Sequence, residues 1–170
     1  MTRLVLLGGG HAHALVLLKL RNFISKNLAV TLVTPSPVHV YSGMVPGVIA
    51  GHYAAADAQI DLSRLAAEAG VELVGGCVRR LDTGAKEVEL FDGNTLGYDV
   101  ASLNLGSLPA GVAPPAIAVK PFREFFARWQ VLLEKGPRAP CIAIAGGGAG
   151  GVELAMAMKF ALDRRGTRHT

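Results

Sequence analysis

The chain has 170 residues, of which 51% are hydrophobic and 6% aromatic, with 21 glycines and a formal net charge of +4. This length suits one domain with a hydrophobic core and is too short for two large ones, and the composition is typical of a compact α/β domain with many tight turns. The basic residues are scattered, and their only dense group, Arg164, Arg165 and Arg168, is typical of a solvated chain end. We therefore expect no nucleic-acid partner.

The two cysteines, Cys77 and Cys141, have neither C-x-x-C nor metal-ligand spacing. This usage predicts a reduced, cytoplasmic protein. No uncharged apolar stretch approaches the ~18 residues that a membrane-spanning helix needs. We expect no transmembrane segment, and peripheral association with a membrane stays open for a longer parent protein.

The first elements predict a βαβ unit. Residues 3–7 form an apolar strand, a glycine turn follows, and residues 12–24 carry a helical run rich in Leu and Val. A second apolar strand covers residues 28–34 and ends at a Pro-Ser-Pro breaker. Strand, glycine turn, helix and strand within about 30 residues are typical of a parallel sheet.

The middle of the chain alternates short elements. Residues 38–53 are punctuated by glycines and a proline, which predicts a loop with one helical turn. Asp61 is a good N-cap for a helix over residues 62–69, which Gly70 ends. A third strand follows in "VELVGG", and residues 77–99 predict an antiparallel β-meander.

A second strand–turn–helix sequence comes later. Residues 100–109 predict another buried strand that stops in a Gly-Ser-Leu-Pro turn, and residues 110–115 are rich in proline and glycine. Pro121 suits the first turn of a helix that Gly136 ends and that carries one apolar face. That face comprises Phe122, Phe125, Phe126, Trp129, Leu132 and Leu133. Residues 141–145 then predict a strand that leads into a second glycine turn and a helix.

The second glycine turn fits G-x-G-x-x-G with Gly146, Gly148 and Gly151. In such a turn the first glycine makes the tight bend, and the second lets backbone N–H groups approach a pyrophosphate. The third allows the helix and the strand to pack closely. The motif therefore predicts a dinucleotide site, with a glycine-rich packing turn that binds no ligand as the alternative.

The first turn keeps Gly8 and Gly10 but has His13 at the third position. A P-loop is excluded because no Gly-Lys-Ser/Thr follows. A zinc site at His11 and His13 would need further ligands, and the remaining histidines lack ligand spacing, so we expect no metal. We expect His13 to be a packed or capping side chain rather than a catalyst. The acidic residue that usually binds the ribose is missing after residues 28–34.

Two dinucleotide turns separated by a meander resemble the two-dinucleotide-binding flavoproteins, in which the first turn holds FAD and the second NAD(P)H. The segment "YDVASLNLGSLP" resembles the second FAD-contacting strand of these proteins, which usually ends Ala-Thr-Gly-Ser, so Asn104 and Leu105 depart from the pattern. More narrowly, "LLGGGHAHALVL", "TPSPVHVYSGMVPGVIAGHY", "VKPFREFFARWQ" and "GGGAGGVELA" resemble one branch. That branch is the NADH-dehydrogenase-like flavoprotein found alone or fused ahead of selenide, water dikinase.

The resemblance implies a Rossmann-like FAD-binding α/β domain and a set of cofactor-binding residues. For the FAD pyrophosphate these are Gly8, Gly10, His11 and Ala12. For the rest of FAD they are Thr34 and Pro35 near the ribose, Ser42, Gly43 and Met44 near the flavin, Val78 near adenine, and Gly106 closing over the cofactor. For NAD(P)H they are Gly146, Gly148 and Gly151. The flavin would carry out the hydride chemistry, no catalytic residue is identified, and a disulfide reductase is disfavoured because no Cys-x₄-Cys pair is present.

The resemblance also implies a domain organisation. Residues 1–109 would form the FAD-binding domain, residues 110–120 a linker, and residues 121–170 a helix plus the start of a second, NAD(P)H-binding Rossmann unit. We expect an N-terminal portion of a longer oxidoreductase that is inactive alone. The alternative is a non-catalytic nucleotide-binding or interaction module. Apolar helix faces and an unpaired strand edge predict a homodimer, and exchange of the C-terminal strand and helix between chains is one form of it.

Overall fold

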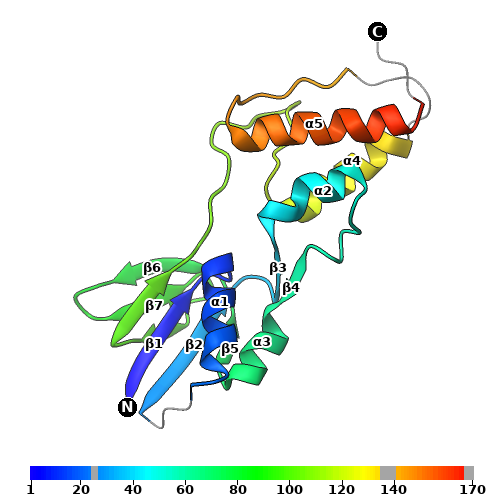
Figure 1. The fold of residues 1–170 in the computed structure, drawn as a ribbon. Coiled ribbons are helices and arrows are strands. Elements are labelled where there is room, and N and C mark those ends of the chain that lie inside the picture. Colours follow the sequence, from blue (N-terminus) through cyan, green and yellow to red (C-terminus); the bar gives the residue numbers. More distant parts are fainter. Residues whose placement is uncertain (24–26, 135–140, 167–170) are drawn as a thin grey trace. The chain divides into compact units, whose positions relative to one another are not determined.

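The computed structural model describes residues 1–23, 27–134 and 141–166. The chain divides into two compact units, coloured along the sequence in Figure 1. Unit 1 consists of Met1–His39 and Ile60–Ser107, and unit 2 consists of Val40–Gln59 and Leu108–Thr170. The first glycine turn belongs to unit 1 and the second to unit 2.

Unit 1 is built on a four-stranded parallel sheet with the strand order β5-β2-β1-β9. Its strands are β1 (Thr2–Leu7), β2 (Leu28–Thr34), β5 (Glu72–Gly75) and β9 (Val100–Leu103). The register places Leu6 of β1 between Leu32 of β2 and Ser102 of β9. Because all four strands run in one direction, their carboxyl ends lie along a single edge of the sheet. The predicted βαβ unit and parallel sheet are confirmed.

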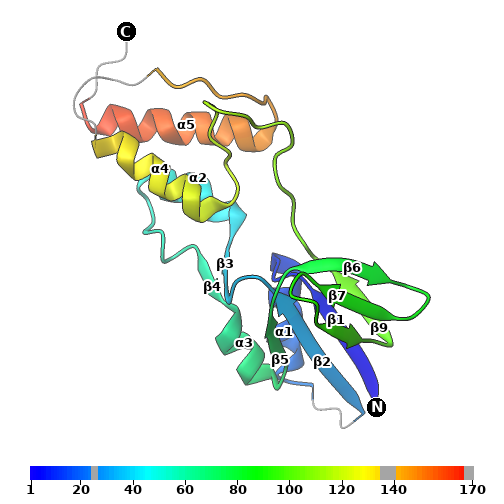
Figure 2. The same ribbon diagram turned by 180° about the vertical axis from the view of Figure 1, so that it is seen from behind.

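The two faces of this sheet are buried against different partners. On one face Leu6 and Leu32 pack against α1 (His11–Leu20) and α3 (Leu62–Ala69), which contribute Leu17 and Leu65. On the other face Val5, Leu7 and Val33 pack against the meander. Neighbouring residues of a strand point to opposite faces. The apolar strands therefore contribute side chains both to the core under α1 and α3 and to the core under the meander (Figure 2).

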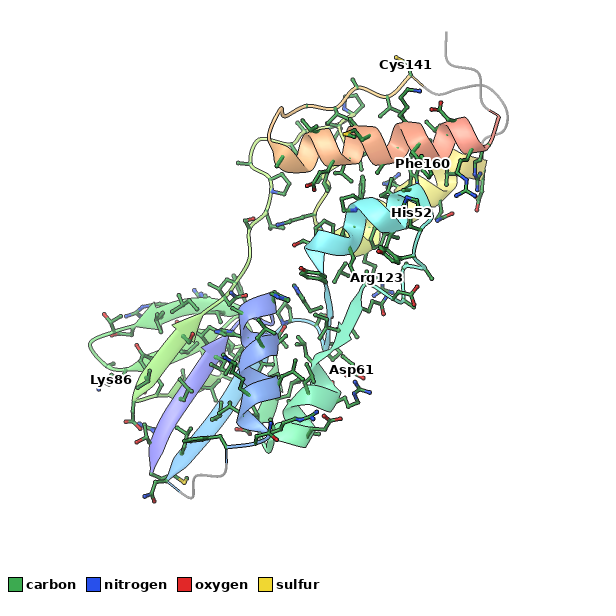
Figure 3. The ribbon with its side chains drawn as sticks, viewed as in Figure 1. His52, Asp61, Lys86, Arg123, Cys141 and Phe160 are labelled. Atoms are coloured by element: carbon green, nitrogen blue, oxygen red, sulfur yellow. The ribbon has the colours of Figure 1, made fainter. Side chains whose placement is uncertain are left out.

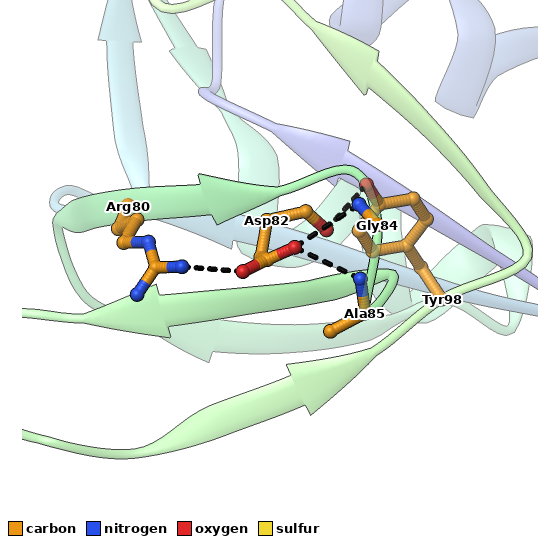
Figure 4. A network of polar contacts seen from close by, with 5 residues as sticks. All are labelled: Arg80, Asp82, Gly84, Ala85 and Tyr98. Atoms are coloured by element: carbon orange, nitrogen blue, oxygen red, sulfur yellow. Dashed lines mark hydrogen bonds and ion pairs between the residues drawn. The ribbon is translucent and has the colours of Figure 1, made fainter.

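The meander is a three-stranded antiparallel sheet with the order β6-β7-β8. It comprises β6 (Val78–Asp82), β7 (Glu87–Leu90) and β8 (Thr95–Gly97). Asp82 shapes its first turn, since Oδ1 accepts hydrogen bonds from the backbone N–H groups of Gly84 at 3.0 Å and Ala85 at 2.8 Å (Figure 4). The carboxylate also pairs with Arg80, and the Tyr98 hydroxyl donates to the Asp82 carbonyl at 3.2 Å. The predicted antiparallel meander is confirmed.

Helix α3 begins and ends at the residues that the sequence predicts. The Asp61 side chain, labelled in Figure 3, accepts a hydrogen bond from the Arg64 N–H at 2.9 Å and so caps the helix. Gly70 takes the left-handed conformation at the other end. Leu62 and Leu65 on the same helix are buried in the core, which anchors α3 to the sheet.

Unit 2 is helical around its own core. Its helices are the 3₁₀ turn η1 (Ser42–Met44), α2 (Val45–Ala50), α4 (Phe122–Glu134) and α5 (Ala149–Arg164). The core joins Ile49 of α2, Phe125 and Trp129 of α4, and Leu154 and Leu162 of α5. The predicted apolar face of α4 is therefore confirmed, and it is covered inside unit 2. The strands β3 (Val38–Val40) and β4 (Gln59–Asp61) form a further two-stranded sheet.

Four predictions about elements are wrong. Residues 38–53 contain β3, η1 and α2 rather than a loop with one helical turn, since Pro46 lies in the first turn of α2 and Gly51 ends it in the left-handed conformation. Strand β9 (Val100–Leu103) is half-exposed rather than buried.

The third concerns residues 141–145, which form no strand. A strand exists only where another strand supplies its hydrogen-bond partners, and within the described part of unit 2 none lies beside this segment. The predicted first helix is also longer than α1, which ends at Leu20, and its last residue, Ile24, lies outside the described residues, as does Gly136.

Candidate functional site

The first glycine turn connects β1 to α1 at the carboxyl edge of the sheet. Gly8 has a φ of +93°, a conformation that favours glycine, and its N–H donates to the Val33 carbonyl of β2 at 2.8 Å. Gly10 is the N-cap of α1, with φ −69° and ψ 171°. Its carbonyl accepts the first helical hydrogen bond, from Ala14 N–H at 3.1 Å.

The second glycine turn has the same backbone shape. Gly146 has a φ of +118°, and Gly148 is the N-cap of α5 with φ −72° and ψ 169°. The Gly148 carbonyl accepts from the Val152 N–H at 3.1 Å. The agreement with the first turn is close at each corresponding glycine. The chain therefore forms the same turn twice, once with the full G-x-G-x-x-G motif and once with His13 in place of the third glycine.

Both turns present the amino end of a helix. The first N–H groups of an α-helix have no acceptor within the helix, and the helix dipole makes that end positive. Gly10 and Gly148 are the N-cap residues of α1 and α5. In the described structure neither helix has a side-chain N-cap hydrogen bond, so no side chain of the protein takes the place of an anion in this way. Turns of this kind suit a phosphate, whose oxygens accept hydrogen bonds from such N–H groups.

The third glycine of the second turn is needed for packing. A Cβ atom on Gly151 would collide with the Gly146 carbonyl oxygen and would lie 3.7 Å from a methyl carbon of Ile144. The helix thus rests directly on the turn that precedes it, which is the role predicted for this glycine.

His13 occupies the corresponding position of the first turn and is buried, with 2% of its surface exposed. Its Nδ1 lies 2.6 Å from the Gly8 carbonyl oxygen, and its Nε2 lies 2.9 Å from the Ser102 hydroxyl of β9. A carbonyl oxygen only accepts, so Nδ1 carries a proton, and in the tautomer protonated on Nδ1 alone Nε2 accepts from the Ser102 hydroxyl. The expectation that His13 is a packed or capping side chain is confirmed.

Asn104 lies against the first turn and was not among the predicted site residues. Its backbone N–H donates to the Leu7 carbonyl at 2.8 Å, which continues the β1–β9 pairing. Its side chain lies over Gly10, so that a Cβ atom on Gly10 would collide with Oδ1 and would lie 2.6 Å from Cγ. The signal in the sequence was its departure from the Ala-Thr-Gly-Ser pattern. Gly106 lies in the loop that follows.

The end of β2 also reaches this turn. Thr34 is buried, and its hydroxyl donates to the Ser36 carbonyl at 3.0 Å. A Cβ atom on Gly9 would lie 2.8 Å from that hydroxyl oxygen, so Thr34 adjoins the first turn, and Pro35 is the next residue of the chain. Together with Asn104, the structure brings the carboxyl ends of β1, β2 and β9 to one place, which is where ligands bind in open parallel sheets.

The remaining predicted residues lie elsewhere. Val78 begins β6 and packs against the core under the meander. Ser42, Gly43 and Met44 form η1 of unit 2, where Ser42 and Gly43 are exposed. Within the described ranges no three His, Cys, Asp or Glu side chains gather in a way that could hold a metal ion. No helix there has both the length and the apolar character needed to cross a membrane.

Comparisons with known proteins identify the family from the sequence and the fold from the structure. The sequence profile described as "Pyridine nucleotide-disulphide oxidoreductase" matches residues 2–165. The structure resembles the sulfide:quinone oxidoreductase from the hyperthermophilic bacterium Aquifex aeolicus, with a TM-score of 0.70 and 20% sequence identity over 99% of this chain and 41% of that one.

Two further solved structures resemble this chain. One is the NADH:rubredoxin oxidoreductase from Clostridium acetobutylicum, with a TM-score of 0.71 and 20% identity over 94% of this chain and 42% of that one. The other is an NAD-dependent persulfide reductase from A. fulgidus, with a TM-score of 0.78 and 18% identity over 95% of this chain and 32% of that one. The chain thus spans less than half the length of each.

Proposed function

Because the chain belongs to the pyridine nucleotide-disulphide oxidoreductase family, we propose that it is the FAD-binding portion of an FAD-dependent NAD(P)H oxidoreductase of the NADH-dehydrogenase-like kind. FAD and NAD(P)H are the cofactors of this family. The observation that supports the proposal best is the pair of matching glycine turns, each opening a helix without a side-chain cap. We also propose that this portion alone does not catalyse the complete oxidoreductase reaction.

The first turn is the proposed FAD site. The backbone of Gly8, Gly10, His11 and Ala12 would hold the pyrophosphate, because the amino end of α1 offers N–H donors and a positive dipole there. The turn fits this group, since no acidic side chain lies in the first turn of α1. The Asn104 side chain lies over Gly10 with its amide oxygen nearest, so Asn104 could donate to a phosphate oxygen only with its NH2 group turned toward the cofactor.

Other residues would hold the rest of FAD. Thr34 adjoins the first turn, and Thr34 and Pro35 would contact the ribose through a hydroxyl and the backbone, in place of the usual carboxylate. Val78 would lie near adenine, and Gly106 would close over the cofactor. Ser42, Gly43 and Met44 would contact the flavin. When bound, the flavin supplies the hydride chemistry, and the residues of this chain bind and orient it.

The second turn is the proposed NAD(P)H site, with Gly146, Gly148 and Gly151 beneath the pyrophosphate. Its backbone shape supports this assignment. A second candidate function is a non-catalytic nucleotide-binding module. The segment 141–145 favours it, because this segment is unpaired among the described residues and a nucleotide site of this class normally lies at the end of a paired parallel strand.

Titration of the purified chain with FAD, followed by quenching of flavin fluorescence, tests the proposal. We expect saturable binding of one FAD per chain. Absence of saturable binding to a protein whose circular dichroism shows it folded would overturn the proposal. Adding NADH to the FAD-loaded chain without oxygen then separates the candidates, because bleaching of the flavin absorbance indicates an oxidoreductase portion that still takes up hydride.

We also propose that the chain forms a homodimer through exposed apolar side chains of α5. Val152, Met156 and Phe160 on this helix remain 51%, 68% and 40% exposed, and such apolar faces favour association. Exchange of the segment from residue 141 to the end of α5 between two chains is one form of this dimer. The predicted apolar face of α4 is not part of the proposed dimer interface, because its residues pack in the core of unit 2.

A further inference from the structure

The two glycine turns differ at one position, and the difference has a structural meaning. In both turns the residue five places after the first glycine faces the carbonyl oxygen of that glycine. In the second turn this residue is Gly151, whose Cα packs directly against the Gly146 carbonyl. In the first turn it is His13, whose Nδ1–H takes the Gly8 carbonyl as its acceptor at 2.6 Å. A hydrogen bond here replaces a packing contact.

The His13 imidazole also connects the first glycine turn to strand β9. Its Nε2 accepts from the Ser102 hydroxyl at 2.9 Å, and Ser102 lies on β9, opposite Leu6 of β1. A glycine at position 13 would leave both the carbonyl and the hydroxyl without this partner. The ring is buried, so both hydrogen bonds are shielded from competing water.

These two bonds lie beside residues that the proposed FAD site uses. Two residues after Ser102, the Asn104 side chain lies over Gly10, and Gly106 follows. A shift of β9 along β1 would therefore move Asn104 relative to the turn. In addition, an unengaged carbonyl oxygen near a bound phosphate would repel it, whereas the Gly8 oxygen is already committed to the imidazole.

We infer that His13 is a positioning residue for the cofactor: it fixes the Gly8 carbonyl and joins the first turn to the Asn104–Gly106 loop. This inference rests on the proposed function, because it assigns His13 a role in holding FAD at the first turn. His13 acts through Gly8 and Ser102 and does not itself contact the cofactor.

The tautomer of His13 gives a test that needs no cofactor. In ¹⁵N-labelled protein, long-range proton–nitrogen correlation distinguishes the two neutral tautomers of each histidine, and His13→Asn identifies the signal. We expect the neutral ring with the proton on Nδ1. A ring whose only proton is on Nε2 would overturn the inference, because Nδ1 could not then donate to the Gly8 carbonyl.

Variants test the effect on FAD. His13→Asn keeps an N–H near the position of Nδ1, His13→Gln keeps an amide near Nε2, and Ser102→Ala removes one hydroxyl from a half-buried residue. We expect His13→Gln to weaken FAD binding by about tenfold, which corresponds to the loss of one buried hydrogen bond. His13→Asn should retain more of the affinity than His13→Gln, and Ser102→Ala should lose several-fold.

The matched control is Ser63→Ala on the exposed side of α3, which should bind FAD like the parent chain. Equal FAD affinity in all variants, together with lowered unfolding midpoints, would show a merely structural role for His13 and leave the proposed function standing. Failure of the unmodified chain to bind FAD would instead overturn the proposed function, and the inference with it. If the His13 variants do not fold, Ser102→Ala still decides between the outcomes.

Discussion

Gly10 lies directly beneath the Asn104 side chain, so that a methyl group at Gly10 would collide with Oδ1 and would lie 2.9 Å from the Asn104 carbonyl oxygen. A glycine at this position of a dinucleotide turn usually allows a pyrophosphate to approach. Here it also allows a side chain of the same protein to approach. The two roles of Gly10, in packing and in cofactor binding, can be separated by experiment.

Gly10→Ala should lower the free energy of unfolding by about 1–3 kcal/mol, as overpacking does. Asn104→Ala should recover part of this loss in the double variant, because two of the three nearest atoms belong to the Asn104 side chain. Urea unfolding of both single variants and the double variant measures the coupling. Gly75→Ala is the control, since its added methyl group meets open space. An FAD affinity that is lower in the double variant than in Asn104→Ala alone shows that the cofactor itself approaches Gly10, whereas equal affinity in these two variants contradicts that role.

The neighbouring glycines of α5 allow a matched comparison. Gly151→Ala should destabilise unit 2, because its Cβ meets the Gly146 carbonyl. Gly150→Ala should stabilise it by about 0.5–1 kcal/mol, since its Cβ meets nothing within 4 Å and alanine favours a helix. Thermal unfolding of the two variants compares them directly. Equal midpoints would contradict the close approach of the helix to the turn.

At the scale of elements, the sequence predicts an element well where capping residues close to it in the chain set its ends. The Asp61 carboxylate and Gly70 bound α3 at both ends, and both are recognisable in the sequence. The glycines and proline of residues 45–51 were interpreted as a loop, although Pro46 and Gly51 mark the start and end of α2. The segment 141–145 has the composition of a strand, but pairing decides whether a strand forms, and composition does not reveal the partner. The position of Asn104 depends likewise on the β1–β9 register.

The meander should respond to acid through Asp82. The Ala85 N–H, with the Arg80 guanidinium and the Gly84 N–H, holds the pKa of this carboxyl below its ordinary value of 3.8, against an opposing effect of desolvation. Because the pKa of Asp82 is lower in the folded state, its ionised carboxylate stabilises the fold above pH 3.8. This stabilisation is lost as the pH falls through the lower, folded-state pKa. We therefore expect Asp82→Asn to show a smaller fall of the urea midpoint below pH 3.8 than the parent chain.

Asp92→Asn in the second meander turn changes the net charge equally and is the control for Asp82→Asn. Both aspartates accept hydrogen bonds from backbone N–H groups of their turns, which makes the comparison close. If the parent chain and Asp82→Asn lose stability in parallel as the pH falls, Asp82 does not contribute to the acid response.

At the scale of the whole molecule, the chain joins two units, each with a core and a glycine turn of its own. The α/β class, the parallel sheet and the meander followed from the sequence because buried apolar strands and turn residues specify them. The cofactors and the family followed from the resemblance carried by the glycine motifs. The domain limits at residues 109 and 120 stay predictions, and they would assign residues 40–59 differently from the compact units.

Association is the property of the whole molecule that the α5 surface predicts. We expect the chain to be a dimer by light scattering, and we expect Met156→Lys to shift it toward monomer because it places a charge within the exposed apolar face. Lys159→Met, on the same helix, removes a charge and should not cause dissociation. A monodisperse monomer at high concentration would contradict the proposed dimer.

Amide hydrogen exchange with and without FAD tests the central claim most directly, because it reports which backbone N–H groups the cofactor protects. The account predicts that FAD slows exchange at residues 8–12 and 104–106 of unit 1, whereas NADH slows exchange at residues 146–151 of unit 2. FAD binding that leaves the exchange of residues 8–12 unchanged would contradict the account.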